Sequence, residues 1–476
     1  MKSVSLRRIA EVTGGFLDGP GRLRVSGVGI DSREIGDGDL FVALEGERND
    51  GHSFLDDARL AGARAAMVER GNRYAEEFRR RGGELPLIAV EDTLEAMGGL
   101  AAHVRDCLDI EAIGVTGTTG KTCTKDFLAS CLGISYRVAA SPGSYNNEIG
   151  TPLTVFSVKS GDQVLITEMG ARHPGDIKAL ARIVKPRRGI ITNIGPGHLE
   201  LFGSPQAVAR TKGELAAALP RDGTLFLNAD DNWTRQVARR TSARVVKFGY
   251  SRSAAYRATG VRLDERGYPA FTLHGPGFDV EVGIQAVGGH QVTNALAAAA
   301  CAREMGLDPE AIAAGLRRAR LSRWRMDARQ APGGYLVIND AYNANPQSMR
   351  AALETLAAMG EKRRTIAVLG PMAELGAGSG EYHLEAGREV VSLDVDLLVA
   401  IGKDAKGYAV AALAGGLPRG SVFCCQSAGD AACILGDIVE PGDVVLVKAS
   451  RVMGLESLAQ ELASNGFARE KMVADV

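Results

Sequence analysis

The fold of this chain is decided by one stretch, Gly114-Val115-Thr116-Gly117-Thr118-Thr119-Gly120-Lys121-Thr122. The largely apolar run 110–113 before it is typical of a short buried strand, and residues 121–132 after it have a helical pattern. A strand, a glycine-rich turn, Gly-Lys-Thr and a helix, in that order, predict a phosphate-binding loop. In such a loop the backbone N–H groups and the positive end of the helix attract phosphate oxygens.

Two side chains of this loop have expected roles. Lys121 would reach the terminal phosphates of ATP, and the hydroxyl of Thr122 would hold a magnesium ion. Val115 stands where the common pattern has its first glycine, so a chance glycine turn before a surface helix is the alternative. The flanking strand and helix favour the phosphate loop. The loop residues expected to bind ATP are Thr116, Gly117, Thr118, Thr119, Gly120, Lys121 and Thr122.

Length and composition limit the other classes of protein. A chain of 476 residues suggests about three domains. Its formal net charge of −1 argues against nucleic acid or a membrane surface as a partner. No apolar run approaches the roughly 18 residues of a membrane span, and the N-terminus lacks the apolar core of a signal peptide, so we expect no membrane insertion. The seven cysteines have no metal-like spacing, which predicts reduced core thiols and a cytoplasmic location.

Apolar runs and helical patterns alternate along the chain, which predicts an α/β fold with three domains. We expect a small N-terminal unit at 1–108, a central unit with the phosphate loop at 109–325, and a C-terminal unit at 326–476. The last is predicted to be a Rossmann-like, doubly wound sheet without a phosphate loop. Residues 255–287 alternate apolar and polar, which favours an antiparallel addition to the central sheet.

The expected strands are short apolar runs, several of which end in polar residues, as parallel strands do beside a site. They lie at 41–44, 65–68, 164–167, 189–192, 224–227, 245–248, 335–339, 364–369, 396–401, 421–425 and 443–447. The expected helices outside the loop lie at 54–63, 93–108, 206–219, 290–304 and 309–319.

Two residues just beyond predicted strands are candidates for metal binding. Glu168 ends the strand at 164–167, where α/β proteins bind ligands, and beside a phosphate loop it would be a magnesium ligand. A solvated glutamate at a strand end is the other interpretation. His198 follows the strand at 189–192, and its imidazole can bind a metal or position a nucleophile. A lone histidine in a loop also has ordinary structural roles.

Three further residues have two interpretations each. Lys212 lies beside the apolar stripe of the helix 206–219, and its spacing alone predicts a solvated lysine. Asn146 and Asn147 follow a Ser-Pro-Gly turn; they can hold phosphate oxygens or orient an acyl group, or they can simply form the turn.

The junction of the second and third units contains two more candidates. Arg325 can clamp phosphate when domains close, or form a surface ion pair between domains. Asp340 ends the first strand of the third unit and can bond a ribose hydroxyl, or serve as a turn residue. Together these features predict an ATP-using enzyme with magnesium and domain closure, and leave kinase, ATPase and ligase open.

Taken together, several segments resemble the Mur ligase superfamily, ATP-dependent enzymes that form amide bonds in peptidoglycan precursor synthesis. The resemblance covers nearly the whole chain, in order, and the family's loop usually lacks the first glycine, as here at Val115. The segments that carry it in the central unit are 116–122, Glu168-Met169-Gly170-Ala171, 193–200, Thr211-Lys212-Gly213-Glu214 and 290–295.

The resemblance implies roles for the candidates. It identifies a catalytic set of Lys121, Glu168, His198 and Lys212, with two magnesium ions held by Thr122, Glu168, His198 and Lys212. Lys212 would be carbamylated, which reverses the expectation from spacing. ATP would also contact Asn294, on the adenine side, and Arg325 and Asp340. ATP would phosphorylate a carboxylate, and an amine would then attack the acyl phosphate.

Segments of the first and third units are most like those of the branch that joins D-alanyl-D-alanine to UDP-N-acetylmuramoyl-tripeptide. In this interpretation the N-terminal domain binds the UDP-substrate, the central one ATP and the C-terminal one the dipeptide, in a protein expected to be a monomer. The implied substrate-binding residues are Ser32, Arg33, Arg48, Asn146, Asn147, Asn343, Asn345, Lys448 and Ser450.

Three alternatives stay open. The sister ligase that adds the third amino acid usually carries Asp-Asn-Pro-Arg, which this sequence lacks. A folylpolyglutamate synthetase shares the central fold, but the long first unit argues against it. A regulatory or scaffolding protein that binds a nucleotide without catalysis is the third, and the presence of the whole catalytic set argues against that.

Overall fold

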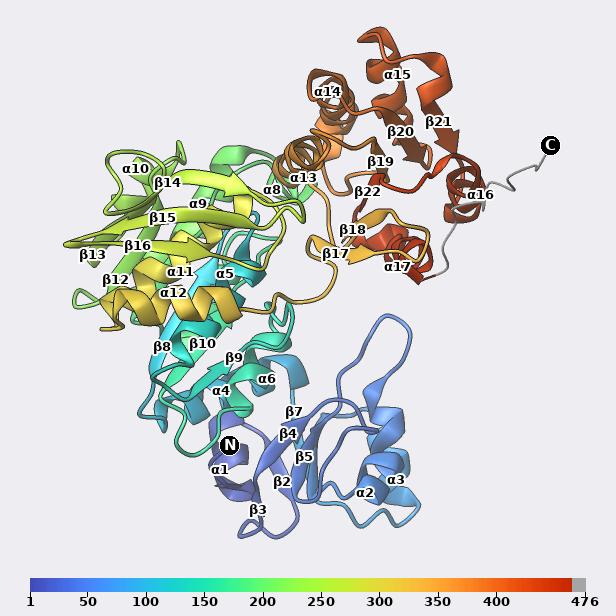
Figure 1. Cartoon of the computed structure of the whole chain (residues 1–476). Coiled ribbons are helices and arrows are strands. Elements are labelled where there is room, and N and C mark those ends of the chain that lie inside the picture. The colour runs from blue at the N-terminus through green and yellow to red at the C-terminus, as the bar shows by residue number, and fades with distance from the viewer. Residues whose placement is uncertain (465–476) are drawn as a thin grey trace.

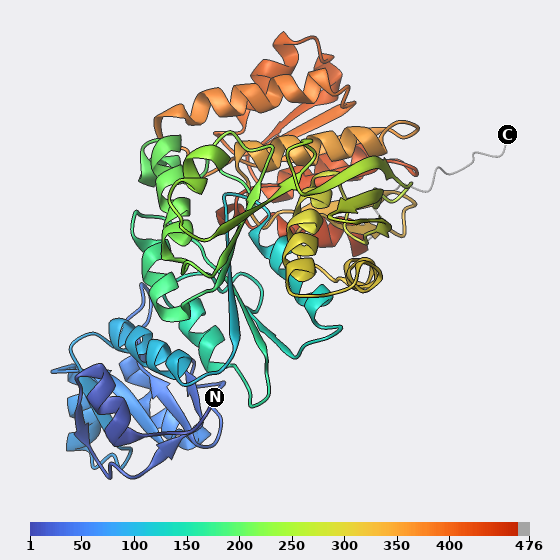
Figure 2. The ribbon, with the colours of Figure 1, turned by 90° about the vertical axis from the view of Figure 1, so that its left-hand side faces the viewer.

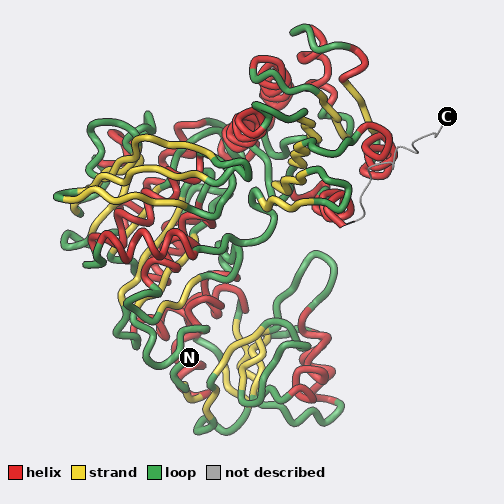
Figure 3. Tube along the Cα trace, viewed as in Figure 1, coloured by secondary structure: helices red, strands yellow, loops and turns green. Residues whose placement is uncertain are grey.

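The computed structural model describes residues 1–464 as three α/β units, each built on its own sheet (Figure 1). The N-terminal and C-terminal units lie at opposite ends of the molecule, with the central unit between them (Figure 2). In every unit the strands form an inner layer with helices outside (Figure 3). The α/β class and the three-domain architecture predicted from the sequence are confirmed.

The N-terminal unit has a five-stranded sheet of order β2-β7-β6-β5-β4, in which only β2 is antiparallel to its neighbour. A separate pair, β1 (Val4–Ser5) and β3 (Arg24–Val25), lies beside it. The other strands are β2 (Phe16–Asp18), β4 (Gly27–Gly29), β5 (Asp39–Val42), β6 (Ala65–Glu69) and β7 (Leu87–Val90). The helices are α1 (Leu6–Thr13), η1 (Gly51–Phe54), α2 (Leu55–Ala61), α3 (Arg73–Arg80) and α4 (Thr93–Asp106).

The central unit has a nine-stranded sheet of order β16-β15-β14-β13-β12-β11-β8-β10-β9. Its strands are β8 (Glu111–Thr116), β9 (Val138–Ala140), β10 (Val164–Glu168), β11 (Arg188–Ile191), β12 (Thr224–Asn228), β13 (Arg244–Gly249), β14 (Tyr256–Leu263), β15 (Pro269–Gly275) and β16 (Phe278–Gly283). The expected antiparallel addition is confirmed for β14, β15 and β16, and β14 joins the sheet parallel to β13.

The helices of the central unit cover both faces of this sheet (Figure 1). They are α5 (Lys121–Leu132), α6 (Gly150–Phe156), α7 (Asp176–Val184), α8 (Leu199–Phe202), α9 (Pro205–Ala218), α10 (Thr234–Ala238), α11 (His290–Glu304) and α12 (Pro309–Arg318). Alternate residues of β8 point into different cores: Ile113 and Val115 pack with α5, α11 and α12, and Ala112 packs on the opposite face. A strand buried on both faces explains the continuous apolar run.

The C-terminal unit has a six-stranded sheet of order β17-β18-β22-β19-β20-β21, parallel except for the edge strand β17. Its strands are β17 (Asp327–Gln330), β18 (Leu336–Asp340), β19 (Thr365–Leu369), β20 (Leu397–Ile401), β21 (Val422–Cys425) and β22 (Val444–Lys448). Its helices are α13 (Pro346–Met359), η2 (Gly376–Gly378), α14 (Ser379–Ser392), α15 (Lys406–Ala414), η3 (Arg419–Ser421), α16 (Ala428–Ile438), η4 (Arg451–Met453) and α17 (Glu456–Ser464).

The N-terminal and central units share one hydrophobic core, which we call the apolar seam. Helix α4 packs on α1 on one side and on α6 and α7 on the other. Its buried residues Leu100 and Val104 belong to a single apolar cluster that reaches from Ile9 of the N-terminal unit to Phe156 and Ile177 of the central unit. Burying α4 between the two units fixes their relative position through the hydrophobic effect.

The expected strands and helices are confirmed to within a few residues, but the prediction omitted several elements that the structure contains. The edge strand β17 and the short strands β2, β4, β7 and β9 carry too few alternating residues to stand out in the sequence. The expectation of core thiols is wrong for Cys107, Cys424 and Cys433, which are exposed, although all seven cysteines are free. The predicted third unit extends to 476, and its residues 465–476 lie outside the described part.

No helix within residues 1–464 combines the length and the apolar composition that crossing a membrane requires.

Candidate active site

The phosphate loop connects β8 to α5, as the sequence predicts. Gly120 precedes α5 with a φ of 76°, in the left-handed region, and a Cβ there would lie 2.2 Å from the Asn294 side-chain oxygen. Only glycine satisfies both constraints. The predicted adenine-side residue Asn294 therefore lies directly against the loop, on α11, where its amide nitrogen donates to Gln291 Oε1 at 2.9 Å.

The shape of the loop is fixed by residues that follow β11. The backbone N–H groups of Thr118 and Thr119 donate to Asn193, to its carbonyl oxygen at 2.9 Å and to its side-chain oxygen at 3.0 Å. The Thr192 hydroxyl donates to the Thr119 carbonyl oxygen at 2.6 Å. Asn193 is thus a supporting residue that sequence reasoning left without a role; its position just beyond a strand of the central sheet was the available signal.

Lys121 begins α5, and its side chain folds back over the loop. Its ammonium donates to the carbonyl oxygens of Gly117 at 3.1 Å and Thr118 at 3.2 Å. Burial lowers the pKa of Lys121, the charge of Glu168 opposes this, and the charge of Arg325 adds to it. The ammonium is therefore held over the loop that is expected to receive phosphates.

Thr122 and Glu168, two predicted magnesium ligands, are in direct contact. The Thr122 hydroxyl donates to Glu168 Oε2 at 2.7 Å, and the Asn146 amide donates to Glu168 Oε1 at 2.7 Å. Glu168 is buried at the end of β10, so it is not a solvated strand-end glutamate. Hard oxygen ligands side by side at a phosphate loop suit Mg²⁺. Asn147, in contrast, accepts from the Gly150 N–H at 2.9 Å, which is turn chemistry.

Lys212 is buried in α9, with 3% of its surface exposed, so the solvated lysine predicted from spacing is wrong. The prediction from periodicity fails because the residues on both sides of Lys212, Thr211 and Gly213, are also buried, so the covered face of α9 is wider than its apolar stripe. Its amine makes no hydrogen bond within residues 1–464. Burial, and next the charge of Lys121, lower the pKa of Lys212 to about 7. A large share of this amine is therefore neutral near neutral pH.

His198 lies just before α8 in the left-handed conformation, with a φ of 52°. Its Nδ1 contacts Oε2 of Glu374 from the C-terminal unit, and the guanidinium of Arg172 contacts Oε1 of the same carboxylate. Burial lowers the pKa of His198, and Glu374 opposes this. The charges of Lys121 and Lys212 also lower the pKa of His198, so the two lysines and the histidine share one site. Within residues 1–464 no three His, Cys, Asp or Glu side chains form a metal cluster.

Arg325 connects the central and C-terminal units. Its guanidinium donates to the Ser144 hydroxyl at 2.9 Å and lies 4.0 Å from the centre of the Tyr342 ring. The Ser144 oxygen in turn lies 3.4 Å from that of Thr122, which brings Arg325 to the edge of the phosphate loop. The predicted position at the domain junction is therefore confirmed, and phosphate binding by Arg325 stays a prediction.

Asp340 pairs with a buried lysine of the neighbouring strand. The Lys448 ammonium lies 2.5 Å from Asp340 Oδ2 and also donates to the Asn343 carbonyl oxygen at 3.0 Å. A fully desolvated lysine requires such partners, since an unpaired buried charge is costly. Asp340 and Lys448 thus already satisfy each other, and their contacts with ATP and substrate stay predictions.

The other predicted dipeptide-side residues are engaged with backbone groups. Asn345 caps α13 by accepting from the Ser348 N–H at 2.9 Å, and the Asn343 side chain accepts from the next N–H at 2.9 Å. The Ser450 hydroxyl accepts from the Ala373 N–H at 2.8 Å. These bonds shape the loops at the end of the third sheet, and substrate binding by the three residues stays a prediction.

The predicted UDP-side residues lie in loops of the N-terminal unit. The exposed Arg33 forms a bidentate pair with Asp31, at 2.6 Å for the shorter bond, and Ser32 beside it is half-buried. Arg48 is exposed in the loop after β5. The pKa of Arg172 is raised chiefly by Glu374, with smaller contributions from the charges of Glu148 and of Glu47 in this loop.

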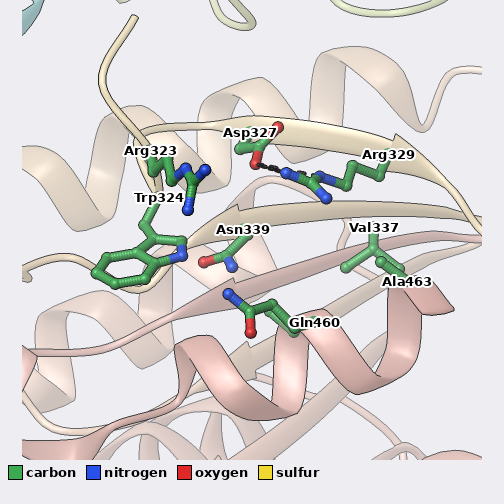
Figure 4. Close-up of a pocket in the computed structure, with 9 residues that line it drawn as sticks. Arg323, Trp324, Asp327, Arg329, Val337, Asn339, Gln460 and Ala463 are labelled. Carbon is green, nitrogen blue, oxygen red and sulfur yellow. Dashed lines mark hydrogen bonds and ion pairs between the residues drawn. The ribbon is translucent and has the colours of Figure 1, made fainter.

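A cavity of about 180 Å³ lies elsewhere, between the start of the C-terminal unit and α17 (Figure 4). In Figure 4 the amides of Asn339 and Gln460 face each other across it. None of the predicted site residues lines it; its lining is Arg323, Trp324, Asp327, Arg329, Val337, Asn339, Ala459, Gln460 and Ala463.

Three family models match the chain in order. They are the Mur ligase family catalytic domain at residues 24–105, the Mur ligase middle domain at 115–302 and the Mur ligase glutamate ligase domain at 324–451. The UDP-N-acetylmuramoyl-tripeptide–D-alanyl-D-alanine ligase of Mycobacterium tuberculosis is 40% identical, with 98% of each chain covered.

Two solved structures have the same architecture. MurF from Acinetobacter baumannii superposes with a TM-score of 0.87 at 30% identity, covering 97% of this chain and 99% of that one. A MurF ligase from Thermotoga maritima, solved in complex with ADP, superposes with a TM-score of 0.79 at 27% identity, covering 93% and 98%.

Proposed function

Since the chain belongs to the Mur ligase family, we propose that it is an ATP-dependent ligase that joins D-alanyl-D-alanine to UDP-N-acetylmuramoyl-tripeptide. The products are an amide bond, ADP and phosphate, in the synthesis of peptidoglycan precursors. The observation that carries the proposal is Lys212, a buried lysine that makes no hydrogen bond within residues 1–464 and whose pKa is lowered by burial and next by the charge of the loop lysine Lys121. The phosphate loop itself supplies one lysine to the phosphates, so a second buried amine is an addition to the ordinary loop.

The loop side chains account for the first half-reaction. A carboxylate is a poor electrophile, so it is activated by transfer of the γ-phosphoryl group of ATP. Lys121 offsets the negative charge that gathers on this group, and the loop N–H groups hold the neighbouring phosphates. Arg325 supplies a second cation from the domain junction. The ADP complex of the Thermotoga maritima relative supports nucleotide binding at this loop.

Four side chains of the candidate site offer atoms that could bind Mg²⁺. Thr122 and Glu168 present oxygens side by side, the Nε2 atom of His198 makes no hydrogen bond within residues 1–464, and Lys212 has no partner there. Two ions in this site would neutralise charge on the phosphates and on the acceptor carboxylate. Thr122, Glu168, His198 and a carbamylated Lys212 would hold them.

Carbamylation of Lys212 follows from charge. A buried ammonium beside Lys121 and metal ions would be repelled, whereas the neutral amine that burial favours would form an N–C bond with CO₂ and release one proton to water, giving an anionic carbamate. The carbamate is a metal ligand, and the unmodified ammonium is not. Among the described residues no protein group competes for this amine, which leaves it free for the modification.

The three units divide the substrates in this proposal. The unit at 1–108 binds the UDP-sugar, the unit at 109–325 binds ATP, and the unit at 326–476 binds the dipeptide. Closure of the third unit over the second brings the amine to the acyl phosphate and excludes water, which would otherwise hydrolyse it. The protein acts as a cytoplasmic monomer.

Phosphate release with a matrix of substrates tests the proposal. UDP-muramoyl-dipeptide and UDP-muramoyl-tripeptide are each combined with D-alanyl-D-alanine, D-alanine, L-lysine and diaminopimelate. We expect phosphate release only when UDP-muramoyl-tripeptide is combined with D-alanyl-D-alanine. A site built to form a hydrogen bond with the extra amide of D-alanyl-D-alanine rejects single amino acids by up to roughly 10⁴–10⁵-fold. A preference for lysine or diaminopimelate with the UDP-muramoyl-dipeptide would instead identify the sister ligase.

A further inference from the structure

Glu374 reaches from the C-terminal unit into the candidate site of the central unit. Its carboxylate oxygens divide their contacts, Oε1 to Arg172 and Oε2 to Nδ1 of His198. Its backbone carbonyl oxygen also accepts from the Glu200 N–H at 3.1 Å, so the main chain as well as the side chain is docked. Glu374 has a φ of 61°, an uncommon left-handed conformation for a residue with a side chain. The fold therefore holds this carboxylate in one place against His198.

This contact determines which ring nitrogen of His198 carries the hydrogen. An ionised carboxylate only accepts hydrogen bonds, so Nδ1 must be the donor. A neutral imidazole has a single N–H group, and the lone pair is then on Nε2. A histidine that binds a cation does so in this neutral form. Nε2 makes no hydrogen bond within the described residues, so its lone pair is free.

We propose that Glu374 is a positioning residue that fixes the Nδ1–H tautomer of His198 from across the domain junction and so presents Nε2 to a divalent cation. The inference rests on the proposed function, because it takes His198 as a ligand of the metal. A carboxylate behind a histidine ligand is a common way to fix the ring and raise its basicity. Here, however, the histidine and the carboxylate belong to different domains.

Because His198 and Glu374 belong to different units, their contact depends on how these units are docked. The cation site is complete only while the C-terminal unit is docked, because docking delivers Glu374. By linkage, a cation on His198 must favour the docked arrangement to the same degree as docking favours the cation. The ligase site would thus be assembled at the moment when the dipeptide-binding unit arrives.

A simple ion-pair latch is the competing explanation, and exposure argues against it. The side chains of His198, Glu374 and Arg172 are 34%, 28% and 65% exposed. Ion pairs screened by this much solvent contribute little to stability. A latch needs only opposite charges, whereas the tautomer depends on Glu374 alone and not on Arg172. The two explanations therefore predict different behaviour for the variants Glu374→Ala and Arg172→Gln.

The first experiment reads the tautomer without metal or turnover. Long-range ¹H–¹⁵N spectra of the full-length protein are recorded with labelled histidine, and the His198 signals are assigned by their loss in His198→Asn. We expect the Nδ1–H tautomer in the unaltered protein and in Arg172→Gln, and a shift to Nε2–H, the common tautomer of a free ring, in Glu374→Ala. Glu381→Gln is the matched control, since the Glu381 carboxylate is exposed and pairs with Arg388 at 2.9 Å.

The second experiment measures Mn²⁺ binding by electron paramagnetic resonance, with a non-hydrolysable ATP analogue present. We expect the affinity of the weaker Mn²⁺ site to fall roughly 10–100-fold in Glu374→Ala, as for other residues that orient a metal ligand. Arg172→Gln and Glu381→Gln should stay close to the unaltered protein. Glu374→Leu, which keeps much of the size of the side chain but has no hydrogen-bond acceptor, repeats the test if Glu374→Ala does not fold.

Three results would overturn the inference: Nε2–H in the unaltered protein, a tautomer or Mn²⁺ affinity that Glu374→Ala leaves unchanged, or an equal effect of Arg172→Gln. A Glu374→Leu variant that only raises the KM for the dipeptide, with the tautomer unchanged, would also overturn it in favour of amine binding. Failure of the proposed function is seen separately, as absent phosphate release from the unaltered protein in the substrate matrix.

Discussion

The central unit contacts the N-terminal unit through apolar packing and the C-terminal unit mainly through polar side chains. The apolar seam to the N-terminal unit is part of one continuous core, with α4 between the two units. The boundary to the C-terminal unit, which we call the polar seam, joins Arg172 and His198 to Glu374 and Arg325 to Tyr342, with a small apolar contact of Val287 and Met359. The candidate site, with Lys121, Glu168 and Lys212, lies beside the polar seam.

This difference indicates which boundary stays fixed and which one opens during turnover. A shared core opens only at the cost of exposing apolar surface, so the N-terminal unit is held against the central unit as a fixed body. Partly exposed polar contacts cost little to separate, because water replaces them. We therefore expect the polar seam to be the one that opens and closes during turnover. The candidate site lies beside this seam, so closure can complete the site.

The largest effect is expected from opening a cavity in the apolar seam. Leu100→Ala should lower the free energy of unfolding by about 2–5 kcal/mol, as for other buried leucines. Glu374→Ala, in the polar seam, should lower it by less than about 1 kcal/mol. Urea unfolding followed by circular dichroism compares the two. Equal losses of stability would contradict the distinction between the seams.

Next in size is the loss of the loop cation beside the polar seam. Lys121→Ala should lower the rate of phosphate release by about 10²–10³-fold, because one preorganised charge on the transferred group is removed. The urea midpoint should hardly change, since within residues 1–464 the Lys121 ammonium bonds only to the carbonyl oxygens of its own loop. Near-normal activity in a folded variant would show that the loop does not serve phosphate transfer.

The sequence predicted the parts of this picture that depend on neighbours in the chain. The loop at 114–122 is recognisable because glycines, a lysine and a helix follow a strand at fixed spacing. Lys212 was misjudged from helical periodicity, because the burial of α9 on more than one face is a property of the tertiary structure. Glu374 is 176 positions from His198. No local pattern signals a partner at that distance, and only docking of the third unit brings it there.

An intermediate effect on kcat is expected from Arg325, which spans the polar seam. Arg325→Ala removes a charged hydrogen bond to Ser144 and the packing on Tyr342, which suggests a roughly 10–100-fold fall in kcat. Because Arg325 acts through closure, ATP binding to the free protein should change much less. Isothermal titration and steady-state kinetics separate the two. Lost ATP binding with unchanged kcat would indicate a static role instead.

A smaller effect concerns the pH dependence of the modification of Lys212. Its pKa, lowered to about 7 by burial, means that the amine is neutral above pH 7 and protonated below it. Protein freed of CO₂ should therefore regain activity on adding CO₂ at a rate that falls about tenfold per pH unit below 7 and levels off above it. The dissolved CO₂ concentration is held constant. Equal recovery at pH 6 and pH 8 would contradict a carbamate that forms on Lys212.

The smallest effect tests how closely the polar seam is packed. A Cβ on Gly195 would lie 2.2 Å from the Gln347 side chain of α13, so Gly195→Ala should hold the C-terminal unit slightly away. Gln347 is flexible and can swing aside, which limits the cost to about 1 kcal/mol, the lower end for overpacking, or roughly fivefold in kcat. Adding Gln347→Ala should restore the rate. If the double variant stays slow, the defect lies within the loop after β11 and not in closure of the seam.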